Sequence, residues 1–143
     1  MKSSVKVLGI EKLAKRIANL AADLASKNRA VVKREAGEIM RVMKAKAPKH
    51  EHKLEKAITT RTWKDRDGVT GVVVGVEGGH PEFYGGTDNK SYYPASQEFG
   101  WENPEGVHHP PQPYIRPAFD ERAPIAKRNI RNTYNSVIEK AGQ

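Results

Sequence analysis

Apolar residues recur at helical spacing through the first third of the chain. One stripe predicts a helix from about Ile10 to Ala25, and a second predicts a helix from about Arg29 to Ala47. The polar run 26–28 between them is a candidate interruption. Pro48 should end the second helix, because a proline pushes the residue before it out of the α region. The stripes consist of Ile10, Leu13, Ile17, Leu20, Ala21 and Leu24, and then of Val32, Ala36, Ile39, Met40, Met43 and Ala47.

The pattern changes to β-branched and aromatic residues after a short charged connector at 49–56. Residues 58–63 favour a strand, and residues 69–76 predict another. The run Asp65-Arg66-Asp67-Gly68 between them is typical of a hairpin turn. We therefore expect an antiparallel hairpin, in which Gly71 and Gly75 indicate a bulge or the close approach of another backbone.

Glycines and prolines dominate the segment that follows the hairpin. The glycine-rich stretch 77–91 is expected to be a mobile loop, whereas 92–99 fits either a third strand or a short helix. Prolines exclude a long helix or a central strand from the next stretch, so 102–112 is predicted to be a second mobile loop that presents a surface. These prolines are Pro104, Pro110, Pro111, Pro113 and Pro117.

A last amphipathic pattern predicts a C-terminal helix. Pro117 suits a first helical position, and Asp120 and Glu121 suit the positive end of the helix dipole. Pro124 is expected either to kink this helix or to start it afresh. The apolar stripe of the helix consists of Ala126, Ile130, Tyr134, Val137, Ile138 and Ala141.

Length and composition exclude several classes of protein. A chain of 143 residues is expected to form a single domain, residues 1–143. It has no cysteine, which excludes disulfides, thiolate metal sites and cysteine nucleophiles. Its first residues lack the continuous apolar core of a signal peptide. No apolar run approaches the roughly 20 residues of a membrane span, so no membrane partner is expected.

The formal net charge of +8 suggests nucleic acid as a partner, because neutralising phosphates releases counterions. Solubility of surface helices explains the same charge equally well. The excess is spread over 2–56 and 127–140 and is interleaved with acidic residues, so no block of like charge forms a nucleic-acid arm. Contact with DNA is therefore allowed but not required.

Candidate chemistry is sparse. His50-x-His52 and His108-His109 lack the i,i+4 spacing of a helical zinc motif, so no metal site is predicted. The glycines between 77 and 90 do not follow the phosphate-loop pattern. Glu98, beside Phe99 and Trp101, is the only acidic residue in clearly apolar surroundings, and one carboxylate is not a hydrolytic mechanism. We expect no catalytic residues and no cofactor.

Four short motifs occur in a fixed order along the chain. Ala45-Lys46-Ala47-Pro48 ends the N-terminal helical region, and Leu54-Glu55-Lys56-Ala57-Ile58 follows it. After the hairpin come Tyr92 with Glu98-Phe99-Gly100, and then Pro113-Tyr114-Ile115-Arg116-Pro117-Ala118 before the last helix. In this order, residues 10–141 resemble the tail-component (neck or tail-completion) protein family of long-tailed, lambdoid-type bacteriophages. Glu51-His52 stands where that family usually has Thr-Gly, and Trp101 stands where Thr usually follows Glu-Phe-Gly.

The resemblance implies an α+β fold, with a small, mainly antiparallel sheet flanked by N-terminal helices and a C-terminal helix. It also implies a structural protein without a catalytic site, which acts at the head–tail joint or in tail completion. The partners would be further copies of the chain in a ring and the neighbouring neck or tail proteins. The location would be the virion, after synthesis in the bacterial cytoplasm. The alternative is a basic nucleic-acid-binding module.

Seven residues are candidates for organising the proline-rich segment and its contacts. They are Tyr93, Glu98, Phe99, Trp101, Tyr114, Arg116 and Phe119. The Arg116 guanidinium is expected to hold a carboxylate, with Glu98 as the first candidate partner. The segment 102–112 is the best candidate for a surface that another subunit touches. A ring of head-to-tail contacts needs two different complementary patches on each subunit.

Overall fold

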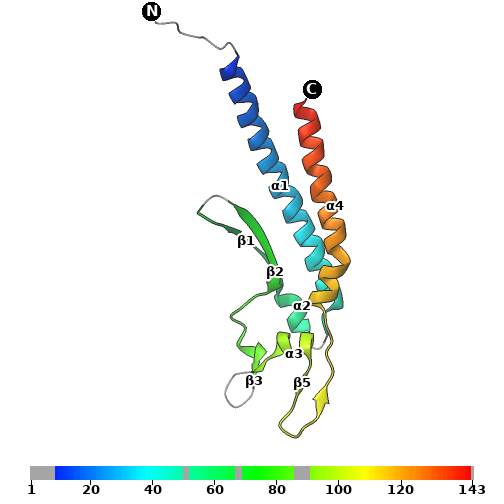
Figure 1. Ribbon diagram of the computed structural model, residues 1–143. Helices are drawn as coiled ribbons and strands as arrows, with labels where there is room; N and C mark the ends of the chain where they lie inside the picture. Colours follow the sequence, from blue (N-terminus) through cyan, green and yellow to red (C-terminus); the bar gives the residue numbers. More distant parts are fainter. Residues whose placement is uncertain (1–8, 50–51, 67–68, 86–90, 143) are drawn as a thin grey trace, which may run out of the picture.

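The computed structural model describes residues 9–49, 52–66, 69–85 and 91–142. Its α+β fold places two long helices side by side, α1 (Ile10–Lys46) and α4 (Ile115–Ala141), as Figure 1 shows. A hairpin of β1 (Ile58–Lys64) and β2 (Thr70–Val76) packs against α1. The predicted fold class, with helices at both ends of the chain and a small antiparallel sheet between them, is confirmed.

Helix α1 runs without a break through the polar residues 26–28, so the predicted interruption is wrong. Serine, lysine and asparagine each reduce helix stability by only a few tenths of a kcal/mol relative to the best helix formers. Without a glycine or proline, such a run does not end a helix that tertiary packing supports. The end of the helix was predicted correctly: Ala47, before Pro48, is extended with φ −60° and ψ 140°.

The charged stretch that was expected to be only a connector contains a short helix, α2 (Lys53–Ala57). This helix exists because it buries Leu54 and Ala57, which are spaced one turn apart, beneath its charged residues. Strand β1 then starts at Ile58, where the chain becomes extended.

The predicted hairpin is confirmed. Its register is continuous from Ile58 opposite Val76 to Lys64 opposite Thr70, so no bulge occurs at either glycine. The close approach at Gly71 is real, but it involves a side chain: a Cβ there would lie 2.5 Å from the Trp63 indole. Residues 67–68 of the predicted turn lie outside the described residues, and Asp65 and Val69 beside them exchange two hydrogen bonds.

Shorter elements follow the hairpin. A 3-10 turn, η2 (Pro81–Phe83), leads into β3 (Tyr84–Gly85), which pairs with β4 (Ser91–Tyr92). The stretch for which strand and helix were both open forms helix α3 (Tyr93–Phe99). Strands β5 (Trp101–Glu102) and β6 (His108–His109) form another antiparallel pair. The mobility predicted for 77–91 and 102–112 stays a prediction, and residues 86–90 lie outside the described ranges.

Helix α4 differs from its prediction at two prolines. It begins at Ile115, so Pro117 is the third helical residue instead of the first. Pro124 lies inside the helix and does not start it afresh. A proline in a helix interior costs about 3 kcal/mol. Packing of α4 along α1 offsets that cost, with Ala118, Ala126 and Val137 buried.

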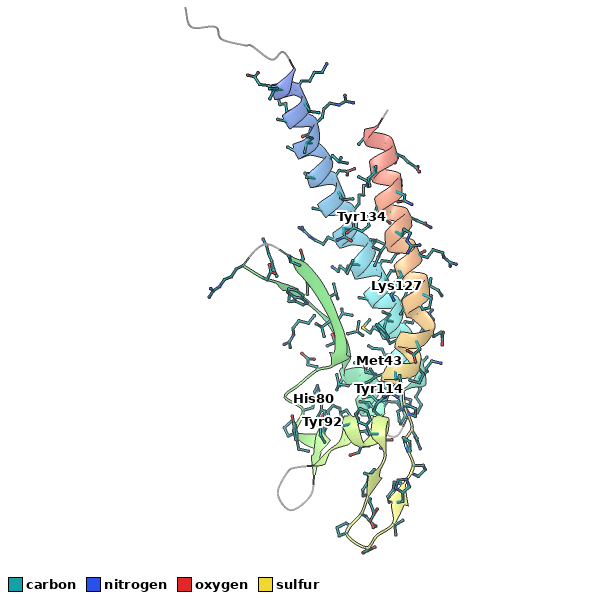
Figure 2. The ribbon with its side chains drawn as sticks, viewed as in Figure 1. Met43, His80, Tyr92, Tyr114, Lys127 and Tyr134 are labelled. Carbon is teal, nitrogen blue, oxygen red and sulfur yellow. The ribbon has the colours of Figure 1, made fainter. Side chains whose placement is uncertain are left out.

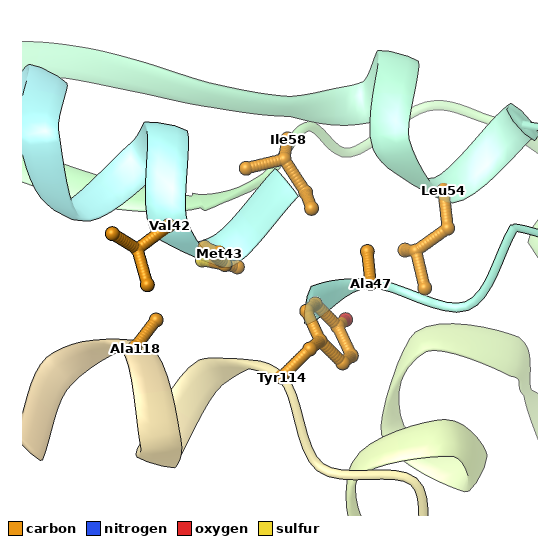
Figure 3. Close-up of a cluster of buried hydrophobic side chains, with 7 residues drawn as sticks. All are labelled: Val42, Met43, Ala47, Leu54, Ile58, Tyr114 and Ala118. Atoms are coloured by element: carbon orange, nitrogen blue, oxygen red, sulfur yellow. The ribbon is translucent and has the colours of Figure 1, made fainter. Parts of the chain in front are cut away.

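The main core lies where the end of α1, helix α2, the start of β1 and the start of α4 meet (Figure 3). Its members are Val42, Met43, Ala47, Leu54, Ile58, Tyr114 and Ala118. Figure 2 places Met43 and Tyr114 at this junction, far from the outer ends of both long helices. Burial of a Val, Leu, Ile or Met side chain stabilises a fold by roughly 1.5–3 kcal/mol. The larger side chains of this cluster therefore fix how the elements meet.

Candidate functional site

A single carboxylate joins the end of α3 to the start of α4. Glu98 lies at the C-terminal end of α3 and is only 7% exposed. Its Oε2 accepts hydrogen bonds from the N–H groups of Tyr114 at 2.8 Å and Ile115 at 2.9 Å. Its Oε1 accepts a third from the N–H of Arg116 at 3.0 Å. The side chain therefore caps a helix that begins 17 residues further along the chain.

This cap accounts for every main-chain donor in the first turn of α4. The first four N–H positions of a helix have no partner within it. Here they belong to residues 114–117. Three of the four donate to Glu98, and the fourth is Pro117, which has no N–H. The carboxylate also places a negative charge at the positive end of the helix dipole.

The environment of Glu98 keeps it ionised. Burial alone raises the pKa of this carboxyl. The hydrogen bonds from Ile115, Arg116 and Tyr114, together with the charge of Arg116, outweigh that effect and hold the pKa below its ordinary value. The group is thus a fixed anion that holds the main chain in place, and a proton-transferring acid would need the opposite shift.

The predicted link between Arg116 and Glu98 occurs, but the donor was predicted wrongly. The main-chain N–H of Arg116 makes the hydrogen bond, and its guanidinium is not among the ion pairs formed between described residues. The Arg116 side chain is exposed, and its positive charge acts on Glu98 only from a distance. Main-chain donors already take two hydrogen bonds at Oε2 and one at Oε1, so a bidentate guanidinium contact, which needs a free position on both oxygens, is not available.

Two of the predicted tyrosines support this joint from inside. Tyr114 is completely buried, and its hydroxyl donates to the carbonyl oxygen of Pro94 at 3.4 Å. Burial, and then the charge of Glu98, raise the pKa of Tyr114 well above its ordinary value. Tyr93 packs against the core and stacks on Phe83, with ring centroids 6.2 Å apart. Tyr114 therefore presents no surface, and Tyr93 is partly buried against the core.

A hairpin arm leaves the same joint. We define the arm as residues 101–109, which comprise β5, β6 and the turn between them. It extends away from the long helices, at the end of the molecule opposite the start of α1 and the end of α4 (Figure 1). Gly100 starts it with φ +77°, and a Cβ there would lie 2.8 Å from the carbonyl oxygen of His109. Only glycine adopts this positive φ readily and has no Cβ to meet the carbonyl oxygen.

Side chains within the arm hold its shape. Trp101 and His109 face each other across the two strands and stack with ring centroids 4.0 Å apart and planes 3° from parallel. In the turn, Asn103 Oδ1 accepts hydrogen bonds from the N–H groups of Glu105 and Val107. The N–H of Gln112 donates to the carbonyl oxygen of Gln97 and ties the base of the arm to α3.

Arg116 apart, the predicted residues therefore separate into two groups of three. Tyr93, Glu98 and Tyr114 are partly or fully buried around one joint. The exposed apolar members lie around it on the surface: Phe99 is 69% exposed, Phe119 is 56% exposed and Trp101 lies on the arm. The structure does not bring these three rings together in a single cluster of stacked rings.

The sequence analysis missed a second buried carboxylate, Glu35, which is 3% exposed in α1. Its Oε2 accepts from Arg122 at 3.2 Å, and its Oε1 accepts from Asn129 at 2.9 Å, so it ties α1 to α4. Arg34 also bonds to Oε1. Burial raises the pKa of Glu35, but hydrogen bonds from Asn129 and Arg34 and the nearby arginine charges lower it overall. The sequence did carry a signal for this site: Glu35 is a charged residue at helical spacing from Val32 and Ile39 of the apolar stripe.

An elongated groove runs along α1 between the hairpin and α4. Its inner part, about 270 Å³, is mostly apolar and is lined by Val32, Ala36, Ile39, Val72, Val74, Ile115, Phe119 and Ile130, among others. Its outer part, about 440 Å³, continues toward the hairpin tip and is lined by Asn28, Arg29, Lys33, Thr62, Val69 and neighbouring residues. Val32 and Val72 line both parts, so they form one surface, which we call the groove.

Other kinds of site find little support within the described residues. In the ranges 9–49, 52–66, 69–85 and 91–142, no group of three or more His, Asp or Glu side chains could hold a metal ion. Within those same ranges no helix is both long and apolar enough to span a bilayer.

No family model, curated protein or solved structure matches the chain. The arrangement of the joint, the arm and the groove therefore carries the functional argument.

Proposed function

We propose that this protein is a structural subunit of a bacteriophage or prophage virion. In this proposal it assembles as a homo-oligomeric ring at the head–tail joint or in tail completion, together with neighbouring neck or tail proteins. It acts through assembly, without catalysis and without a cofactor.

The observation that carries the proposal is the contact between two of the four motifs whose order carries the resemblance. Glu98-Phe99-Gly100 and Pro113-Tyr114-Ile115-Arg116-Pro117-Ala118 are separate in sequence, yet three hydrogen bonds to Glu98 connect them. The two motifs therefore form one joint. Each motif has a physical task there: glutamate as the cap, glycine for the positive φ, and proline as the residue without an N–H.

The distribution of exposed apolar side chains also supports an assembly role. Phe99, Trp101 and Val107, which do not line the groove, are all more than two-fifths exposed. Aromatic residues are enriched where protein surfaces meet. Together with the groove they give the subunit two unlike surfaces, as a head-to-tail ring requires.

Electron microscopy of the purified chain tests the proposal. Negative-stain images and sedimentation velocity over a wide concentration range should show closed rings in equilibrium with smaller species. A chain that remains monomeric at every concentration would count against the ring. Genes for a portal, a head-closure protein and a major tail protein are the expected neighbours of this gene, and a different neighbourhood would also count against it.

A basic nucleic-acid-binding module is the second proposal. It is favoured by Arg29 and Lys33, which line the groove and form no ion pair with another described residue. Fluorescence anisotropy with labelled duplex DNA tests it. Affinity that falls steeply with salt, with a slope equivalent to several phosphate contacts, would support it. Binding that is too weak to measure at low salt would exclude it.

A further inference from the structure

We infer that the arm of one subunit docks into the groove of a second copy of the same chain. This inference rests on the proposed ring function and assigns the two surfaces that meet. The arm comprises residues 101–109, and the groove lies between α1, the hairpin and α4.

Charge is the first argument, because the arm has the opposite sign to the rest of the chain. Residues 91–115 contain no lysine or arginine, in a protein whose net charge is +8. Their acidic residues are Glu98, Glu102 and Glu105. Glu98 is occupied by the cap, whereas Glu102 and Glu105 are exposed and form no ion pair with another described residue. The arm therefore presents two unpaired carboxylates.

The groove offers the complementary charge. Arg29 and Lys33 lie one turn apart on the exposed edge of α1 and line its outer part. The acidic side chain that lines the inner part, Glu35, is already bonded to Arg122 and Asn129. An incoming acidic segment would thus meet two positive charges and no unpaired negative charge from the lining.

The apolar surfaces of the two partners also correspond. The arm exposes Trp101 and, at its turn, Val107. The groove exposes aliphatic side chains and the ring of Phe119 without anything to cover them.

The arm is directed at another molecule instead of at its own groove. The positive φ of Gly100, the Gln112–Gln97 hydrogen bond and the Trp101–His109 stack fix it pointing away from the long helices (Figure 1). Because the arm and the groove are different surfaces, the contact is heterologous and can repeat from subunit to subunit. The contacts within the arm also preorganise it, which lowers the entropic cost of docking.

Cysteine cross-linking tests the contact directly, since the chain has no cysteine of its own. Full-length Glu105→Cys is mixed with full-length Lys33→Cys under mild oxidation, and disulfide-linked dimers are measured on a non-reducing gel. A disulfide forms only where the two Cα atoms approach within about 7 Å, so the assay reports proximity. The control pairs Glu105→Cys with Asn135→Cys, an exposed position on α4 that does not line the groove. The arm–groove mixture should give several times more dimer than the control.

Charge-exchange variants test the same contact without cysteine. Glu102→Lys with Glu105→Lys on the arm, or Arg29→Glu with Lys33→Glu in the groove, should each weaken self-association roughly tenfold. A mixture of the two variants should recover association, because each then supplies one intact surface complementary to the other. Recovery excludes misfolding as the cause of the loss.

The outcomes separate this inference from the proposed function. Closed rings combined with cross-linking no higher than in the control would overturn the arm–groove contact and leave the ring proposal standing. Open cross-linked chains instead of rings would support the contact and count against the ring. If Arg29→Glu with Lys33→Glu abolishes binding of labelled duplex DNA and leaves self-association unchanged, the groove serves nucleic acid and the inference fails.

Discussion

Glu98 and Glu35 are both buried, ionised carboxylates, yet they hold the molecule together through different kinds of donor. Glu98 accepts its hydrogen bonds from main-chain N–H groups at the start of α4. Glu35 accepts from the side chains of Arg122, Asn129 and Arg34. The first contact fixes where a helix begins and in which direction it runs. The second fixes how two helices already formed lie against each other.

The difference predicts how each site responds to mutation. Main-chain donors are present with any residue except proline at positions 114–116, so apart from a proline substitution only a change at Glu98 itself can remove that contact. The Glu35 site depends on three side chains and can be weakened from several positions. It is also imperfect: Arg122 Nε is buried without a hydrogen-bond partner among the described residues. Glu98 should therefore be the more important of the two carboxylates.

The largest effect is expected for Glu98→Ala. Three main-chain donors would lose their acceptor in a largely buried site, so the substitution should cost about 3 kcal/mol of unfolding free energy. Glu98→Gln should cost less, because its amide oxygen can still accept while its NH₂ group faces the remaining donors. Urea denaturation followed by circular dichroism measures both. Glu102→Ala, on the exposed arm, is the control and should change stability by less than about 0.5 kcal/mol. An Ala variant as stable as the wild type would disprove the capping role.

Glu35→Ala should have the second largest effect, about 2 kcal/mol, since it leaves Arg122 and Asn129 without their acceptor. Replacing both charges, as Glu35→Leu with Arg122→Met, should cost less than the single change, because no buried charge is then unpaired. Denaturation of the two variants gives the comparison. Glu38→Ala is the control: it breaks an exposed ion pair with Arg41, three residues further along α1, and should have little effect on stability. A double variant that is less stable than Glu35→Ala would contradict this account.

The elements that could be predicted from the sequence are those set by local signals, whereas contacts between distant segments could not be predicted. Local signals predict the end of α1 at Pro48, the β1–β2 hairpin and the C-terminal helix. These signals are a proline, β-branched and aromatic residues on both sides of a turn, and a helical stripe. Helix α2 was missed because only tertiary burial of Leu54 and Ala57 supports so short a helix. The residues of the Glu98 joint were identified, but the donors were not. A cap that acts across 16 to 18 residues has no local pattern, and main-chain donors leave no mark on residue identity.

Acidification should weaken both carboxylate sites together. Their folded pKa values lie below the ordinary value of 4.5, so their contribution is complete above that pH and is lost as the pH falls through the folded values. The melting temperature should therefore be nearly constant from pH 7 to about pH 5 and should fall below about pH 4. The double variant Glu35→Gln with Glu98→Gln should be less stable at pH 7, but its melting temperature should fall less on acidification. If the melting temperatures of the wild type and the double variant fall by the same amount, these two carboxylates are not the source of the pH dependence.

The smallest effect is expected for Arg116→Ala, although Arg116 belongs to the motif that meets Glu98. The hydrogen bond to Glu98 Oε1 comes from the main-chain N–H, which alanine retains, and the guanidinium lies at the surface. Only the screened attraction between two charges is lost, so stability should fall by less than about 0.5 kcal/mol. Arg116→Pro is the informative counterpart, because it removes the N–H and would leave Oε1 without that donor. The proline variant should be clearly less stable than the alanine variant in the same urea titration. Equal losses in the two would mean that the guanidinium, and not the main chain, holds Glu98.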